Sequence, residues 1–327
     1  MNPTPDADLL RLLRNATLHL SASEVCDQLR WSPTQLNDRL IALRSAGYEI
    51  EEHPHLGIKL TGAPDRLIAD DLFPPNEADR IGRRIMVFES TASTNDLAAK
   101  LGHDGEPDGL AIFAETQTGG RGRLGRRWES EPGQGLYFSL LIRPEFERHY
   151  WTELTTWAAV AVAKAIEQVG RCEAKIKWPN DIYLDGKKGV GILSEAHTDK
   201  YSMPFAIVGI GVNVNQVEFP PEIASIATSI RQVTGAKIDR RELVLRIFEN
   251  LEESYHLVGH DFPQITAEAD RRSFLKGKWV RLEAGASVVE GIAGELGPEG
   301  ALQILQADGS IISVSSGEVT VSRIAKA

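Results

Sequence analysis

The hydrophobic pattern of this chain changes twice along its length, and these changes constrain the fold more than any other feature. Apolar residues recur at helical spacing in residues 1–62, and short apolar strands alternate with helices in residues 85–272. Only strand-like runs follow in residues 273–327, while residues 63–84 contain LFPPNEADR and little periodicity, as a linker does. The sequence therefore predicts three structural units joined by one linker.

The first segment carries the signals of three short helices and a hairpin. Leucines stripe a first helix as far as Asn15, and capping boxes begin the other two, Ser21 with Glu24 and Ser32 with Gln35. The run YEIEEHPHLGIKL then alternates around a central turn, as two paired strands do. Helices followed by a two-stranded wing predict a winged helix-turn-helix.

A winged helix-turn-helix suggests DNA binding, although this segment is not basic. Its six Lys/Arg against eight Asp/Glu give a net charge of −2, in a chain of net charge −10. On the third helix Asn37 and Arg39 can hydrogen-bond to base edges, whereas the negative charge of Asp38 would be repelled by the DNA phosphates. The alternative is a three-helix module for dimerisation or packing. The predicted DNA-binding residues are Thr34, Gln35, Asn37, Arg39 and Arg44.

The central segment predicts a mixed sheet with helices, in an α+β or α/β domain. Strands are expected at 84–88, 110–114, 136–141, 182–184, 191–195 and 206–214, and helices at 93–101, 151–169 and 240–258. From Ser273 onward the strands are short and the turns tight, the last strand being VTVSRI. This pattern is typical of a small barrel.

The most unusual stretch is residues 115–128, ETQTGGRGRLGRRW, which concentrates glycine and arginine. Glycines let backbone N–H groups approach an anion closely, and guanidinium groups bind phosphate or carboxylate through two hydrogen bonds. No acid lies between Thr116 and Trp128 to offset the four arginines. The stretch therefore predicts a polyanion site; the alternative is a solvated basic loop, or one that binds RNA. It is not a Walker A loop, because GxxxxGK[ST] is absent.

Two further clusters carry candidate site residues. In KIKWPND, Lys177 comes just before the break that Trp178-Pro179 imposes, where its ammonium can serve as a point charge for an oxyanion. An ordinary surface lysine is the alternative. In VGIGVNVN, Gly209 and Gly211 leave room for a flat ring to lie against the strand backbone.

Several classes of protein are excluded. The longest apolar run, residues 157–163, is too short to span a membrane, and the N-terminus has acids where a signal peptide needs bases. Cys26 and Cys172 lack CxxC spacing and fit a reducing cytoplasm. The sequence has no GxSxG or HExxH motif, and no metal site is predicted. We therefore expect a cytoplasmic protein with no membrane partner.

Taken in order, these motifs resemble the biotin protein ligase family. The series is Ser93-Thr94-Asn95, GRGRLGR at 120–126, KWPND at 177–181, GIL at 191–193 with Glu195, and GIGVN at 209–213. Together with the predicted winged helix, the whole chain resembles the bifunctional members that also repress the biotin operon. Leu124 departs from the family, in which an arginine is frequent at this place in the loop.

The resemblance implies an α+β fold of three domains. They would be a winged helix-turn-helix (1–62), a class II synthetase-like ligase domain on a mixed sheet (85–272, after the linker 63–84), and an SH3-like barrel (273–327). The implied reaction uses ATP, Mg²⁺ and biotin. The biotin carboxylate attacks the α-phosphorus, giving biotinyl-5′-AMP and pyrophosphate. A lysine of the biotin carboxyl carrier protein of acetyl-CoA carboxylase then attacks this anhydride.

The resemblance also implies roles for individual residues. Lys177 would bridge the carboxylate and α-phosphate oxygens, and Arg123 would hold phosphates, as the two catalytic residues. The implied substrate-binding residues are Ser93, Thr94, Asn95, Gln117, Gly120, Arg121, Gly122, Arg123, Arg126, Trp128, Lys177, Asn180, Gly191, Gly209, Gly211 and Asn213.

Repression would follow from the same ligand. Biotinyl-5′-AMP would order the Gly/Arg loop, the ordered surface would form a homodimer, and the dimer would place two winged helices on palindromic operator DNA. Two alternatives remain: a biotin-sensing regulator without catalysis, and a lipoate or octanoate ligase, which shares the domain type and a similar lysine. The presence of Lys177 with the complete arginine loop favours catalysis, and GRGRLGR followed by a small barrel favours biotin.

Overall fold

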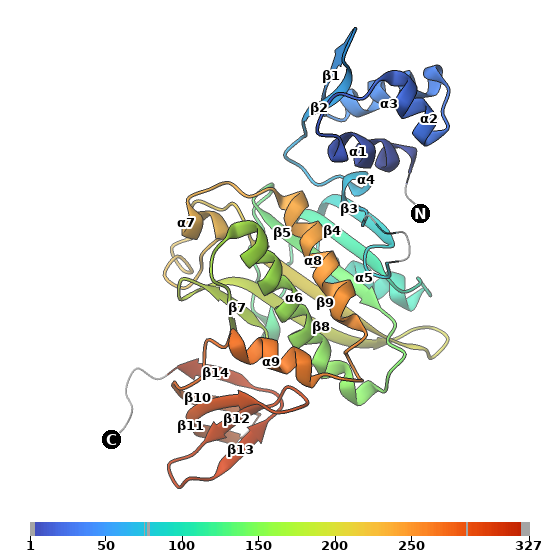
Figure 1. Ribbon diagram of the computed structural model, residues 1–327. Helices are drawn as coiled ribbons and strands as arrows, with labels where there is room; N and C mark the ends of the chain where they lie inside the picture. Colours follow the sequence, from blue (N-terminus) through green and yellow to red (C-terminus); the bar gives the residue numbers. More distant parts are fainter. Residues whose placement is uncertain (1–3, 75, 77–78, 286, 322–327) are drawn as a thin grey trace.

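The computed structural model describes residues 4–74, 76, 79–285 and 287–321. A helical unit lies at one end, a seven-stranded sheet with its helices in the middle, and a five-stranded sheet at the other end (Figure 1). The predictions for 1–3, for 75, 77 and 78 in the linker, and for 322–327 lie outside the described residues. Among those described, no helix is long and apolar enough to cross a membrane.

The N-terminal unit has the three helices and the hairpin that its capping signals predict. Both capping boxes are formed: Glu24 Oε2 accepts from the Ser21 N–H at 2.7 Å, and Gln35 Oε1 from the Ser32 N–H at 2.8 Å. Leucines of all three helices share one small core with Ile58 of the hairpin. The elements are α1 (Pro5–Asn15), α2 (Ala22–Leu29), α3 (Pro33–Ser45), β1 (Glu49–His53) and β2 (Gly57–Gly62).

The described residues of the predicted linker 63–84 are packed against their neighbours. They contain a one-turn helix, α4 (Ala69–Leu72), and several of their apolar residues are buried in the central core. Asp71 accepts two hydrogen bonds from Arg14 of α1, at 2.7 and 2.5 Å, and one from Arg241 of α8 (Arg240–Tyr255) at 2.9 Å. This carboxylate therefore joins the N-terminal unit to the central domain.

The central sheet has the order β3-β4-β5-β9-β8-β7-β6. β3 and β4 are parallel and every other neighbouring pair is antiparallel, so the sheet is mixed, as predicted. Its strands are β3 (Arg84–Thr91), β4 (Leu110–Gln117), β5 (Gly135–Ile142), β6 (Lys175–Lys177), β7 (Asp181–Leu184), β8 (Lys187–Thr198) and β9 (Pro204–Asn213). β6 was not predicted, because three residues are too few to show a period.

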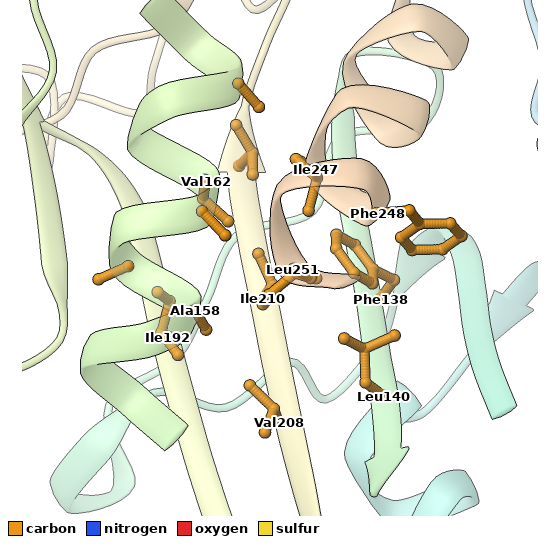
Figure 2. Packing of buried hydrophobic residues seen from close by; sticks show 14 of the residues in the cluster. Phe138, Leu140, Ala158, Val162, Ile192, Val208, Ile210, Ile247, Phe248 and Leu251 are labelled. Atoms are coloured by element: carbon orange, nitrogen blue, oxygen red, sulfur yellow. The ribbon is translucent and has the colours of Figure 1, made fainter. Parts of the chain in front are cut away.

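Two layers of helix cover this sheet. α6 (Glu153–Gly170) and α8 pack on one face, where Val208 and Ile210 of β9 meet side chains such as Val162 and Ile247 (Figure 2). α5 (Thr94–His103) covers part of the opposite face, with Ala98 against Ile112 and Ile207. The short helices α7 (Ile230–Thr234) and α9 (Pro263–Arg271) were not predicted.

The C-terminal strands form a second antiparallel sheet, in the order β13-β12-β11-β10-β14. Within the described residues, β13 and β14 are the two edge strands and do not pair with each other. The part described is therefore an open five-stranded sheet, whereas a small barrel was predicted. Trp178 of the central domain donates its indole N–H to the Gly300 carbonyl at 3.0 Å, which attaches this sheet. The strands are β10 (Trp279–Ala284), β11 (Ser287–Leu296), β12 (Leu302–Leu305), β13 (Ile311–Val314) and β14 (Glu318–Val321).

Replacing Trp157 tests the packing between α6 and α8. The indole is fully buried, donates to the Leu251 carbonyl at 3.2 Å and meets Tyr255 edge-on. We expect Trp157→Ala to lower the free energy of unfolding by about 3–5 kcal/mol, because it leaves a cavity that the rigid core cannot fill. Trp157→Phe, the matched control, keeps a ring and should cost less in the same urea titration. Equal costs for the two variants would contradict this description of the core.

Candidate functional site

One cavity of about 510 Å³ collects nearly all the predicted site residues. It lies between the face of the central sheet that carries α5 and the edge of the C-terminal sheet, which contributes Glu318 and Val319. Both predicted catalytic residues, Lys177 and Arg123, line it. So do these predicted substrate-binding residues: Ser93, Thr94, Asn95, Gln117, Arg121, Gly122, Arg126, Trp128, Asn180, Gly191, Gly209, Gly211 and Asn213.

Gly120 is the one predicted residue that does not line the cavity. Its carbonyl accepts from the Trp128 N–H at 2.9 Å, and a Cβ at this position would lie 2.7 Å from the Trp128 carbonyl oxygen. Gly120 therefore allows the two arms of the Gly/Arg loop to approach each other, which is a shaping role rather than a ligand contact.

The Gly/Arg loop is a hydrogen-bonded turn. The N–H of Thr118 donates to the Thr91 carbonyl at 2.9 Å, and the N–H of Gly122 to the Arg126 carbonyl at 2.7 Å. At its tip Leu124 adopts a left-handed φ of +58° and is 75% exposed. The residue that departs from the family's arginine therefore projects into solvent.

The polar end of the cavity lies at the first turn of α5. Gln117 Oε1 accepts from the Thr94 N–H at 2.8 Å and lies 3.0 Å from the Thr94 hydroxyl. Ser139 of β5, fully buried, places its hydroxyl 2.7 Å from Thr94 Oγ1 and 2.6 Å from Asn95 Oδ1. Sequence reasoning missed Ser139, because a serine within an apolar strand gives no signal of its partners.

The floor of the cavity is glycine. In the β8–β9 register Gly191 stands opposite Gly211, and Leu193 opposite Gly209. A Cβ at Gly211 would lie 2.6 Å from the Trp128 indole, and one at Gly209 would lie 2.1 Å from Asn95 Oδ1. The flat groups that these glycines accommodate here are therefore the protein's own indole and amide. The indole Nε1 of Trp128 is buried and has no hydrogen-bond partner in the structure described.

Two lysines line the cavity, although the sequence drew attention to only one. Lys177 Nζ lies 3.2 Å from the Tyr183 hydroxyl, on the side near the C-terminal sheet. Lys188 forms an ion pair with Asp181 at 2.7 Å and lies 5.6 Å from the centre of the Trp128 ring. Lys188 carried no signal in the sequence, because the strand predicted there begins at residue 191. β8 begins at Lys187, and its register brings Lys188 to the cavity.

Protein carboxylates neutralise most of the loop arginines. Arg121 pairs with Asp96 at 2.5 Å, Arg127 with Glu129 at 3.2 Å, and Arg126 with Glu318. The hydrogen bond from Arg126 lowers the pKa of Glu318. Arg123 differs, because its hydrogen-bond partner is the neutral Asn180 Oδ1, at 3.1 Å. Arg123 therefore keeps its charge available for an anion in the cavity.

The far end of the cavity is apolar. Phe219, Ile223, Ile226 and Ala227 line it, and Asn213 closes it by donating to the Thr228 carbonyl at 3.0 Å. Such a wall suits a flat aromatic group. In the described part of the chain, no group of three or more His, Cys, Asp or Glu side chains could hold a metal ion.

The predicted DNA-binding residues are all exposed on the N-terminal unit, but three have partners within it. Gln35 completes the capping box of α3, Arg39 lies 3.5 Å from Asp6, and Arg44 pairs with Glu52 of the hairpin at 2.5 Å. Thr34 and Asn37 are also exposed on α3.

Comparison with known proteins identifies the family of this chain. The Biotin/lipoate A/B protein ligase family matches residues 87–215. The bifunctional ligase/repressor BirA of Bacillus subtilis (strain 168) is 35% identical over 81% of this chain and 83% of its own. The protein of that name from Escherichia coli (strain K12) is 27% identical over 96% of each chain.

Solved structures show the same relationship. The biotin protein ligase from Aquifex aeolicus, in complex with biotin and ATP, aligns with a TM-score of 0.64 at 33% identity. The alignment covers 74% of this chain and 100% of that one. The chain therefore belongs to the biotin protein ligase branch of the biotin/lipoate A/B protein ligase family.

Proposed function

We propose that this chain is an ATP-dependent biotin protein ligase. It would activate biotin as biotinyl-5′-AMP and transfer the biotin to a lysine of the biotin carboxyl carrier protein of acetyl-CoA carboxylase. The observation that carries this proposal is one cavity with a polar end, a cationic middle and an apolar end. The Aquifex aeolicus neighbour, solved with biotin and ATP, supports this choice of ligands.

Strand β9 sets the order of these three parts. Gly209 lies beside the Asn95 amide, Gly211 under the Trp128 indole, and Asn213 beside the apolar wall. Alternate residues of a strand face the same side, so the three positions form one row about 13 Å long. An extended ligand along this row would place its ends in different chemical surroundings.

The polar end suits the ureido ring of biotin. Gln117 Oε1 is held by the Thr94 N–H, and Nε2 gives one hydrogen to Ser130 Oγ at 3.5 Å, so one amide hydrogen remains to donate to a ligand carbonyl. The Ser93 hydroxyl, which accepts from the Asp96 N–H at 3.4 Å, still has a hydrogen to donate. Two donors favour a ligand with a carbonyl acceptor, and the dithiolane ring of lipoate has none. This observation favours biotin over the lipoate alternative.

The middle of the cavity suits the meeting of two anions. Lys188 lies beside the Trp128 ring and next to Gly191, and Arg123 is without a carboxylate partner in the structure described. We assign the bridge between the biotin carboxylate and the α-phosphate to Lys188 and Arg123, in place of the bridge through Lys177 that the resemblance implies. Lys177, nearer the C-terminal sheet, would bind the outer phosphates. Attack on the α-phosphorus needs no protein nucleophile, only fixed positive charge and the exclusion of water.

Magnesium fits this site as a ligand of the nucleotide rather than of the protein. The carboxylates that line the cavity are all paired, Asp181 with Lys188, Glu318 with Arg126 and Glu129 with Arg127. The ion would therefore be held mainly by phosphate oxygens and water. When bound, it neutralises the phosphates that accept the attack.

The free thiols of Cys26 and Cys172 are consistent with the reducing cytoplasm that we expect as the location.

Replacing each lysine separately tests the reaction and the assignment together. We expect Lys188→Ala to slow biotin-dependent ATP–pyrophosphate exchange by at least ~10²-fold, the cost of losing one donor to the transition state. Lys177→Ala should also slow exchange, by raising the KM for ATP while the Kd for biotin stays unchanged.

Lys187→Ala is the matched control, because this neighbouring lysine bonds the exposed Ala224 carbonyl at 3.1 Å and lies outside the cavity. Full exchange activity in Lys188→Ala would remove that lysine from the mechanism. An absence of exchange with biotin in the unmodified protein would contradict the ligase function itself.

A second function, biotin-responsive repression, is favoured by the N-terminal unit. We propose that residues 1–62 are a winged helix-turn-helix with α3 as its recognition helix, and that residues 273–327 are an SH3-like domain beside the catalytic domain 85–272. The Escherichia coli relative named ligase/repressor matches 96% of this chain, which includes most of this unit. Exposed Thr34 and Asn37 have the chemistry to read base edges.

Selection from a random DNA duplex library tests this second function. With biotinyl-5′-AMP present, we expect enrichment of two inverted half-sites, because a ligand-promoted homodimer would present two recognition helices. Asn37→Ala should relax the preference at one base pair per half-site, by about 1–3 kcal/mol. Failure to enrich any sequence, with a monomer in sedimentation at saturating adenylate, would leave residues 1–62 as a packing module.

A further inference from the structure

A continuous chain of polar side chains surrounds the polar end of the cavity, and it has a fixed direction. It runs from Arg121 through Glu195, Asn95, Ser139 and Thr94 to Gln117. Its two ends lie four residues apart in the chain, Gln117 at the end of β4 and Arg121 in the Gly/Arg loop, so the backbone closes a ring, which we call the polar ring. Its members come from α5, β4, β5, β8 and the Gly/Arg loop.

The direction begins at Glu195 because a carboxylate only accepts hydrogen bonds. Asn95 therefore turns its amide nitrogen to Glu195, with Nδ2 and Oε2 2.6 Å apart. The other Glu195 oxygen lies 3.5 Å from the Arg121 guanidinium. Glu195 thus connects the first turn of α5 and the Gly/Arg loop to β8.

The amide oxygen of Asn95 then needs a donor. It lies 2.6 Å from Ser139 Oγ, and the amide is 5% exposed and rests against Gly209. The Ser139 hydroxyl has one hydrogen for two neighbours, Asn95 Oδ1 and Thr94 Oγ1, and the orientation set by Glu195 makes Oδ1 the acceptor. The Thr94 hydroxyl must then donate to Ser139 Oγ, and the Thr94 N–H holds Gln117 Oε1 at 2.8 Å. Both ends of the Asn95 amide are therefore occupied by the protein.

We infer that Glu195 and Asn95 are positioning residues for biotin binding rather than contacts to biotin. Through this amide they hold Thr94, and the Thr94 N–H in turn holds Gln117 so that one of its two amide hydrogens can donate to the ureido carbonyl. This role differs from the one that the resemblance implies, in which Asn95 binds the substrate directly. The inference rests on the proposed function, because it assigns roles at the same cavity.

Exchanging donor and acceptor between the two residues tests the inference. Asn95→Asp places two carboxylates together, and we expect it to raise the Kd for biotin by about 10- to 100-fold, the cost of an uncompensated buried group. Adding Glu195→Gln supplies an amide that donates in the reverse direction, to the carboxylate introduced at position 95. The double variant should bind biotin within about 5-fold of the unmodified protein, since it loses only the partly exposed contact to Arg121 and the long hydrogen bond from Asn95 Nδ2 to the Leu193 carbonyl at 3.4 Å.

The measurement is isothermal calorimetry with biotin, together with KM and kcat in pyrophosphate exchange. We expect the rescue in the Kd and KM for biotin, with kcat at saturating biotin changed little. Glu249→Gln added to Asn95→Asp is the matched control, because Glu249 is an exposed partner of Arg246 on α8 and should rescue nothing. A double variant no better than Asn95→Asp would overturn the inference.

Folding of the single variant does not decide the result. If Asn95→Asp is unfolded in a thermal scan, the comparison becomes the double variant against Glu195→Gln alone. Similar biotin affinity in these two supports the polar ring, and a Kd that is more than about 50-fold higher in the double variant overturns it. If the unmodified protein does not bind biotin, the proposed function fails, whereas failed rescue in a protein that binds biotin rejects the inference alone.

Discussion

The alternation of side chains along β9 is the constraint on which the rest of the site depends. Val208, Ile210 and Val212 face α6 and α8 and belong to the main core, while Gly209 and Gly211 face the cavity. One strand therefore supplies both the rigid support and the space for a ligand. Because side chains alternate at every residue, a register slip of one position would put valines in the cavity and glycines in the core.

Side-chain contacts at both ends of the central domain position the N-terminal unit and the C-terminal sheet. Asp71 connects α1 to α8 through two arginines, and burial together with Asp71 raises the pKa of the nearby Tyr48 hydroxyl. At the opposite end Trp178 holds the C-terminal sheet so that Glu318 reaches Arg126 of the Gly/Arg loop. A ligand that contacts this loop would therefore affect residues of both the central domain and the C-terminal sheet.

Local signals in the sequence predicted local structure well. Capping boxes located α2 and α3, and the family motifs named most of the residues that line the cavity. The sequence did not show which side chains meet across the sheet. Ser139, Lys188 and Glu318 reach the site through strand register and domain contact, which depend on residues far apart in the chain. The sequence predicts a polyanion site at the loop arginines, and the structure adds that three of the four also pair with protein acids, Asp96, Glu318 and Glu129.

Mass spectrometry of the protein after incubation with biotin and Mg-ATP tests the central claim most directly. The cavity, with its ordered polar, cationic and apolar parts, predicts that biotinyl-5′-AMP forms and stays bound, and that lipoate offered in parallel gives no adenylate. A folded protein that binds biotin yet forms no adenylate would contradict the account, and would make this chain a biotin-sensing regulator.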